Sequence, residues 1–300
     1  MATKLQTPTP AKGVQFQLNA NTFLRTGYTF NGWSTNYASS ISEFADNAYV
    51  TFDGDRDLYA LWKANNYQVR FNANGGTGSM GNQTFTYDQG QYLTANAFGR
   101  TGHDFNKWTA NADGSGNQYG NGVWVSNLTA TPGGIVDLYA QWDIKQYTAT
   151  FVHNDGTGAI TQKTQDYGSA LTAPTLTRTG YTLSSWSPAV DSTMQAENKT
   201  YTAQWGANTY TVTFNKQDGT GGTNSTTVTY GQAMPTITPP TRTGYIFGGY
   251  YDGTNGSGTQ YYNADGTGVT GRTWNKASSG TLYAQWTPDY ITVTFYSNDD

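Results

Sequence analysis

Residues 210–232 read YTVTFNKQDGTGGTNSTTVTYGQ, in which apolar or aromatic side chains alternate with polar ones on both sides of a glycine-rich centre. Alternation with a period of two is typical of half-buried β-strands, and a glycine-rich connection favours a tight turn. This stretch therefore predicts a β-hairpin. The chain continues with RTGYIFGGY at residues 242–250 and LYAQW at residues 282–286, which predict two further strands of the same small sheet.

The same series of segments occurs four times along the chain. An Arg-Thr-Gly segment begins at residues 25, 100, 178 and 242, and the closing strands end at Trp62, Trp142, Trp205 and Trp286. A repeated order of this kind predicts an array of small modules in which each contacts only its neighbours. We expect an N-terminal tail at 1–12, repeats at 13–62, 67–142, 147–205 and 210–286, and the unpaired first strand of a further repeat at 290–300.

Two features of the spacing extend this prediction. Four residues separate the closing tryptophan from the next first strand at each of the three linkers, as between Trp62 and Tyr67. Short linkers of constant length predict that the modules form an elongated rod. Repeat 1 differs, because residues 14–18 lead almost directly into Arg25. We expect repeat 1 to begin at its second strand and to lack the first.

The quoted segments resemble the Listeria-Bacteroides repeat family of bacterial surface proteins, related to the B repeat of internalin B. The resemblance covers nearly the whole chain and is best in repeat 4, where Tyr250 stands in place of the family's tryptophan. It is weakest in repeat 3, where Ser184 and Ser185 replace the usual glycine and the loop after Trp186 is short, which argues against binding there. The resemblance implies a β-grasp-like module, a cell-surface location and no catalysis.

Composition supports a β-rich chain, between all-β and α+β. Aromatic residues make up 15% of the sequence beside 36 glycines, which suits short strands joined by tight turns. Only 12% of residues are charged and the net charge is -4, so nucleic acid and anionic membranes are poor partners. The absence of cysteine excludes disulfides and thiolate chemistry. With no long apolar segment, we expect an extracellular protein whose targeting segments are not in this chain and which does not insert into a membrane.

Few residues suggest chemistry. His103 and His153 lie in different repeats without a nucleophile at motif spacing, which makes a catalytic triad or a zinc site improbable. Asp53, Asp55 and Asp57 alternate as in the start of a calcium loop, but no bidentate carboxylate follows. A solvated turn is the favoured interpretation, and a calcium ion is the open alternative. We therefore expect no enzymatic activity and no cofactor.

The recurring tryptophans are expected to pack in the cores or between modules, because Trp33, Trp108 and Trp186 occupy one repeat position. Other aromatic residues lie in the segments whose length varies between repeats, and loops of variable length usually face solvent. We expect these to bind a surface glycan or a host protein. They are Tyr119 and Trp124 in repeat 2, and Tyr261, Tyr262 and Trp274 in repeat 4.

The favoured function is a structural stalk or fibre segment of a surface appendage or adhesin. The alternatives are an adhesive module that uses the long loops, an accessory domain of a longer enzyme, and a phage or virion fibre component. Both ends suggest self-assembly, since an unpaired strand can complete an incomplete sheet. Donor-strand addition would then join molecules head to tail, unless the ends reflect a longer array. The residues involved would be Ile291, Val293 and Phe295 at one end, and Val14, Phe16 and Leu18 at the other.

Overall fold

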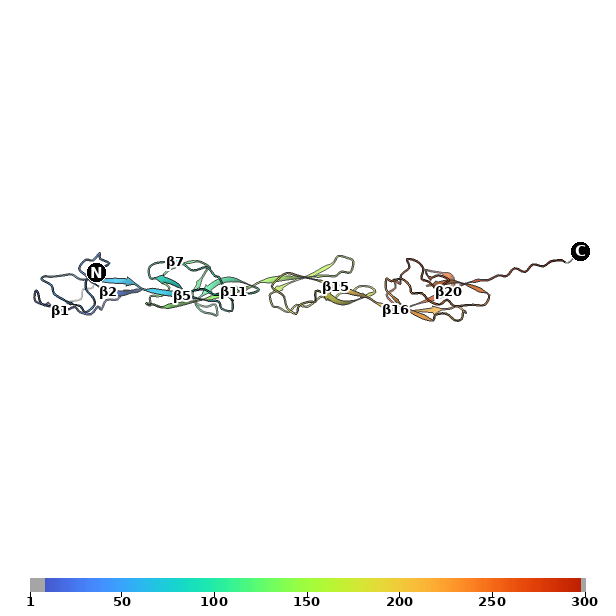
Figure 1. Ribbon diagram of the computed structural model, residues 1–300, viewed down its shortest axis with the longest axis horizontal. Helices are drawn as coiled ribbons and strands as arrows, with labels where there is room; N and C mark the ends of the chain where they lie inside the picture. The colour runs from blue at the N-terminus through green and yellow to red at the C-terminus, as the bar shows by residue number, and fades with distance from the viewer. Residues whose placement is uncertain (1–8, 298–300) are drawn as a thin grey trace. The chain divides into compact units, whose positions relative to one another are not determined.

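The computed structural model describes residues 9–297, so most of the expected tail at 1–12 and the last three residues lie outside the described part. Two units divide the chain, residues 1–146 and 147–300. Strands joined by turns and irregular loops make up the described structure (Figure 1), and its helical content is a single 3-10 turn, η1 (Thr254–Gly256). The prediction of a β-rich chain with several small sheets is confirmed.

Repeat 2, in the first unit, contains a five-stranded sheet in the order β6-β5-β11-β8-β9. The hairpin predicted at the start of each repeat is formed here by β5 and β6, which pair antiparallel. The first and last strands, β5 and β11, pair in parallel at the centre of the sheet. A small second sheet joins β7 and β10. The strands are β5 (Asn66–Asn72), β6 (Gln83–Thr86), β7 (Gln91–Tyr92), β8 (His103–Thr109), β9 (Gln118–Tyr119), β10 (Trp124–Val125) and β11 (Ile135–Ile144).

The main sheets of repeats 3 and 4, in the second unit, follow the same plan with one difference. The sheet of repeat 3 has four strands in the order β13-β12-β15-β14, whereas that of repeat 4 has five in the order β17-β16-β20-β18-β19. Both keep the central parallel pair. The strands are β12 (Gln146–Val152), β13 (Ile160–Asp166), β14 (Tyr181–Ser187), β15 (Lys199–Ala207), β16 (Thr209–Asn215), β17 (Ser225–Thr229), β18 (Tyr245–Tyr251), β19 (Gln260–Tyr262) and β20 (Gly280–Pro288).

Repeat 1 is smaller. It pairs β1 (Phe16–Gln17) with β3 (Tyr49–Val50), and β2 (Tyr28–Ser34) with β4 (Tyr59–Ala64). Because β1 pairs with β3 as β7 pairs with β10, β1 corresponds to β7 and not to the second strand of the hairpin. The interpretation of residues 14–18 as that second strand is therefore wrong, and the described part of repeat 1 has no counterpart of β5 or β6.

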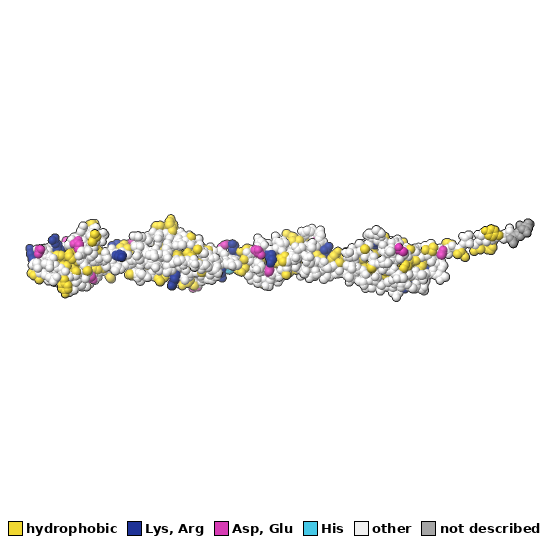
Figure 2. All heavy atoms as spheres, in the orientation of Figure 1, with side chains coloured by type: hydrophobic (Ala, Val, Ile, Leu, Met, Phe, Trp, Pro, Cys, Tyr) yellow, Lys and Arg dark blue, Asp and Glu magenta, His cyan; other side chains and the backbone are white. Residues whose placement is uncertain are grey.

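Each repeat has its own aromatic core. In repeat 2, Tyr67, Val69 and Phe71 project from β5 into the core with exposures of 1%, 0% and 5%, which confirms the alternation used to predict the strand. Each closing tryptophan is half-buried. The Trp142 indole N–H donates to Ala73 O just after β5, at 3.0 Å. The last strand thereby fixes the start of the first turn. Figure 2 shows few charged side chains on this face of the molecule, as the composition predicts.

Candidate functional site

The Arg-Thr-Gly-Tyr motif of repeat 1 forms the contact with repeat 2. Gly27 O accepts the Asn65 N–H at 2.9 Å, and Asn65 O accepts the Tyr87 N–H at 2.9 Å. The Tyr87 ring lies directly on Gly27, where a Cβ atom would come within 2.2 Å of the ring. The Tyr28 ring meets the Tyr87 ring edge-on, with centroids 6.0 Å apart. Glycine is thus required at this position because a neighbouring repeat packs against its backbone.

The same junction joins repeats 3 and 4. Gly180 O accepts the Asn208 N–H, and Asn208 O accepts the Tyr230 N–H, both at 2.9 Å. A Cβ atom on Gly180 would come within 2.4 Å of the Tyr230 ring. Tyr181 again contributes the edge-on ring, at 5.5 Å from the Tyr230 ring. Two junctions with the same contacts indicate that the motif docks one repeat on the next.

Arginine supports the aromatic ring of the motif, both in these two junctions and in repeat 4. The guanidinium carbon of Arg25 lies 3.6 Å from the centre of the Tyr28 ring. The corresponding distance is 4.0 Å from Arg178 to Tyr181, and also 4.0 Å from Arg242 to Tyr245. A stacked guanidinium holds the ring in place by a cation–π interaction. The motif therefore supplies both the glycine on which the next repeat's tyrosine packs and a tyrosine ring held in a fixed position beside it.

Most of the predicted binding aromatics are not available for binding. Tyr261, Tyr262 and Trp274 are only 2%, 0% and 0% exposed, in the core of repeat 4. Tyr261 and Tyr262 lie in β19, Trp274 lies after it, and the Tyr262 ring packs on Phe214 with centroids 5.4 Å apart. The expectation that this long segment faces solvent is wrong, because its extra length forms a further strand of the sheet. Tyr119 is half-buried in the equivalent strand, β9, against the core of repeat 2.

Trp124 differs from the others, since its side chain is 56% exposed. It packs edge-on against Tyr92, which is 65% exposed, with ring centroids 5.0 Å apart. Both rings lie on the small β7–β10 sheet. Trp124 therefore remains a surface aromatic whose binding function is a prediction.

The residues predicted to take part in self-assembly divide into two groups. Leu18 is 4% exposed in the core of repeat 1, and the Phe16 ring packs on Phe52 at 5.8 Å, so neither offers an open core. Val14 is 53% exposed. At the other end Ile291, Val293 and Phe295 are 85%, 61% and 89% exposed, and the structure assigns no strand to residues 289–297. Strand addition between molecules stays a prediction.

The titratable candidates form no cluster. His103 Nδ1 lies 2.8 Å from Thr101 O, and His153 Nε2 lies 2.8 Å from the Thr161 hydroxyl. Among residues 9–297, no three His, Asp or Glu side chains are grouped as metal ligands, and the alternating aspartates at 53, 55 and 57 are included in that statement.

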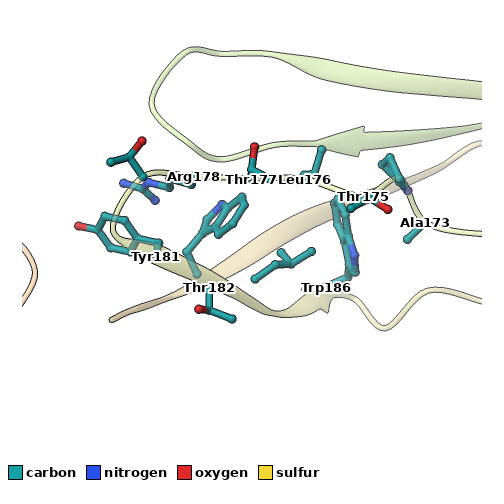
Figure 3. Close-up of a pocket in the computed structure, with 12 residues that line it drawn as sticks. Ala173, Thr175, Leu176, Thr177, Arg178, Tyr181, Thr182 and Trp186 are labelled. Carbon is teal, nitrogen blue, oxygen red and sulfur yellow. The ribbon is translucent and has the colours of Figure 1, made fainter. Parts of the chain in front are cut away.

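A groove of about 740 Å³ lies in repeat 3, between residues 173–179 and β14. Trp186 lies across one part of the groove and Thr177 lies along one side of it (Figure 3). Leu183 and Trp205 also line it. The Trp205 indole N–H donates to His153 O at 2.8 Å, so this ring is held in position. The groove is a cavity in the described part of the chain that could receive a ligand.

Smaller side chains contribute to the groove. In repeat 2 the Phe105 ring packs between Trp108 and Trp142, at 5.0 and 5.8 Å from their rings. Leu183 occupies the Phe105 position in repeat 3. Leu176 likewise stands where repeat 2 has Phe98, whose ring packs on Trp108 at 6.1 Å. Two phenyl rings that fill this region of repeat 2 are therefore absent from repeat 3.

A different turn opens the groove further. In repeat 2 the turn after β5 pairs with residues beside the Arg-Thr-Gly motif, since Thr77 and Gly99 exchange two backbone hydrogen bonds of 2.7 and 3.0 Å. In repeat 3 the corresponding Thr157 instead donates from its backbone N–H and its hydroxyl to Asp155, at 2.9 and 2.6 Å. β-branched Ile160 extends the following strand towards this tight turn. The turn thus leaves the groove uncovered.

The charges near the groove are few. Arg178 donates to Asn154 O at 3.2 Å while it stacks on Tyr181. The hydrogen bonds from Thr157 lower the pKa of the Asp155 carboxyl, so Asp155 is ionised at neutral pH and committed to its own turn. Arg178 is consequently the charged side chain that lines the groove.

Sequence reasoning missed this site, and it had argued against binding in repeat 3. The signal was present in the alignment of the four repeats. Leucine replaces phenylalanine at 176 and 183, and the segment after Trp186 is too short to supply a fifth strand. Each of these differences removes material from the same side of the module.

Comparison with known proteins finds a match in each of four successive segments. A family model described as the Listeria-Bacteroides repeat domain matches residues 4–61, 67–141, 147–205 and 210–285. A Gly-rich protein of Evansella cellulosilytica that is named as a membrane protein is 28% identical over 91% of this chain and 32% of its own length. Internalin H of Listeria monocytogenes is 34% identical over 47% of this chain and 25% of its own length.

The chain spans about a third of the length of the first relative, and 38% of a second Evansella cellulosilytica protein that is also named as a membrane protein and is 28% identical. Within the described part of this chain, no helix has the length and apolar character needed to cross a bilayer.

Proposed function

Because the chain belongs to the Listeria-Bacteroides repeat family, which is found in bacterial surface proteins, we propose that it serves as a non-enzymatic spacer in a surface protein. Successive repeats would hold other parts of the protein away from the cell. The observation that carries this proposal is the junction in which a tyrosine of one repeat packs on a glycine of the preceding one.

The junction suits a spacer because it leaves a neighbouring repeat little freedom. Two backbone hydrogen bonds in series pass through Asn65, and the Asn65 side-chain oxygen also accepts from the Thr29 hydroxyl at 2.6 Å. Asn208 accepts from Thr182 in the same way, at 2.6 Å. Contacts of this kind couple each module to its neighbour, as in other repeat arrays. We infer that the array is an elongated rod.

The strand arrangement supports the β-grasp-like module that the family resemblance implies. A central parallel pair is formed by the first and last strands of repeats 2, 3 and 4. The segment between the second and third strands contains no helix in any of these repeats. We infer a reduced β-grasp in which a loop covers the core, together with the small β7–β10 sheet in repeat 2.

Small-angle X-ray scattering tests the spacer. A compact globule of this length would have a radius of gyration of about 19 Å. We expect a value well above that for the full chain, and a broader distance distribution for a Gly27→Ala/Gly180→Ala double variant whose junctions are disrupted. Gly244→Ala is the control, since a Cβ atom there has no neighbour within 4 Å. A compact wild-type value would contradict the spacer function.

A further inference from the structure

Backbone groups that repeat 4 pairs internally are open in the groove of repeat 3. In repeat 4 the Thr241 N–H donates to Thr220 O at 2.9 Å, and Thr241 O accepts the Thr220 N–H at 2.8 Å. Thr177 occupies the Thr241 position relative to the Arg-Thr-Gly motif and lines the groove. In the described part of the chain, no hydrogen bond to the Thr177 backbone is formed. A donor and an acceptor are therefore available at one wall.

The turn of repeat 4 shows which chemistry fits against these groups. Asp218 pairs with Arg242, with a nitrogen–oxygen distance of 3.5 Å. Gly219 follows and lies against the closing Trp286, where a Cβ atom would come within 2.6 Å of the indole. Thr220 then makes the two backbone hydrogen bonds. In this turn an acidic residue pairs with an arginine, and the glycine that follows lies on an indole. The third residue exchanges two backbone hydrogen bonds with a threonine.

Repeat 3 has the groups that bind this turn in repeat 4, but its own turn does not lie against them. Arg178, Trp205 and Thr177 correspond to Arg242, Trp286 and Thr241. The Asp-Gly-Thr sequence of repeat 3 itself is held in its own tight turn, and a Cβ atom on Gly156 would have no neighbour within 4 Å. This turn therefore does not cover Trp205.

The sheet edge beside the groove is open as well. In repeat 1 the Trp33 N–H donates to Phe44 O at 2.8 Å, and in repeats 2 and 4 the equivalent residue pairs with β9 or β19. Within residues 9–297, β14 pairs only with β15, so Trp186 has no partner on its outer side. The unpaired edge continues the receiving surface, and unpaired edges accept added strands.

We propose that the groove of repeat 3 binds an extended peptide segment of a partner protein, in which an acidic residue is followed by glycine. The carboxylate pairs with Arg178, the glycine crosses the Trp205 ring, and the next residue exchanges two backbone hydrogen bonds with Thr177. Main-chain hydrogen bonds supply affinity and the indole surface selects the small residue, as in other modes of strand addition. The site borders the junction of repeats 3 and 4 and shares Arg178 with it, since this guanidinium also stacks on Tyr181.

Titration of the full chain with a blocked peptide, KQDGTGG, which copies residues 216–222, tests this site. We expect the indole N–H signals of Trp186 and Trp205 to shift in two-dimensional NMR spectra. A peptide with leucine in place of the first glycine should bind at least about tenfold more weakly, because a large side chain meets the indole. Trp124→Ala, which removes an exposed indole in repeat 2, is the matched control and should leave the titration unchanged.

Groove-filling variants complete the test. Leu183→Phe and Leu176→Phe introduce the phenylalanines of repeat 2 and should each weaken peptide binding by about tenfold or more. Three results would overturn the proposal: no shift of either indole at millimolar peptide, equal binding of the leucine-substituted peptide, or shifts produced by cellotetraose and not by the peptide. The last result would identify a glycan site.

Discussion

Repeats 3 and 4 differ most where the chain length between the two motifs differs. Repeat 4 uses its longer segment to form β19 and to bury Tyr261, Tyr262 and Trp274. Repeat 3 has no such strand, and Trp186 stays half-buried beside an open edge. The same framework can thus be closed by its own aromatic side chains or left open. Length variation in this array changes the core of a module as well as its surface.

The largest expected effect separates a closed core from an open one. Trp274→Ala removes a fully buried indole and should lower the free energy of unfolding of repeat 4 by about 3–5 kcal/mol. Trp186→Ala should lower that of repeat 3 by about half as much, because its ring is already partly exposed. Calorimetry can resolve the transitions. Equal losses would show that the two cores are closed to the same degree.

The next effect tests the glycine of the junction. Gly180→Ala places a methyl group against the Tyr230 ring at a positive φ of 79°, and should destabilise by about 2–4 kcal/mol. Gly244→Ala has a similar φ of 75° with open space around it, and should cost only about 1 kcal/mol. Urea titration of both variants isolates the contact between repeats. Equal destabilisation would indicate that backbone strain alone requires the glycine.

Alkaline pH should act mainly on repeat 4. Burial raises the pKa of Tyr250 to about 12 and also raises that of Tyr262, and neither hydroxyl has a hydrogen-bond partner. Folding therefore favours the neutral phenol, and this contribution is complete below pH 10 and lost as the pH rises towards 12. The loss from Tyr250 is on the order of 2–3 kcal/mol. The unfolding midpoint of repeat 4 in the wild-type chain should therefore be lower at pH 12 than at neutral pH.

The matched variant for this pH profile is Tyr250→Phe/Tyr262→Phe. It retains the rings without the ionisable groups, so its unfolding midpoint should depend less on pH between 10 and 12. If the unfolding midpoint of the variant depended on pH as steeply as that of the wild type, groups other than these two tyrosines would cause the alkaline transition.

The smallest effect has the opposite sign. Leu183→Phe adds a ring between Trp186 and Trp205, as Phe105 does in repeat 2, and should stabilise repeat 3 by about 1 kcal/mol. A higher melting temperature of the repeat 3 transition would check this. A lower one would mean that the groove cannot accept a phenyl ring without strain.

The sequence predicted the strands well where alternation and repetition agree. The hairpins at Tyr67 and Tyr210 and the paired closing strands follow directly from the pattern of apolar side chains. It failed for Tyr261 and Tyr262, because a loop and an additional strand share the same polar, glycine-rich composition. It also failed for the groove, since the turn at Asp155 has nearly the sequence of the turn at Asp218 but pairs differently. Whether a segment forms a loop or a strand, and how a turn pairs, depends on the side chains that pack around it.

The parallel pairing of first and last strands has a mechanical consequence. A tensile force on a repeat enters at the start of the first strand and leaves at the end of the last one, for example at Tyr67 and Trp142 in repeat 2. Since β5 and β11 are adjacent and parallel, such a force slides one strand along the other. The hydrogen bonds between them are then loaded together in shear and must rupture almost simultaneously. The order of strands in the sheet would make repeats 2, 3 and 4 resistant to extension by flow or traction.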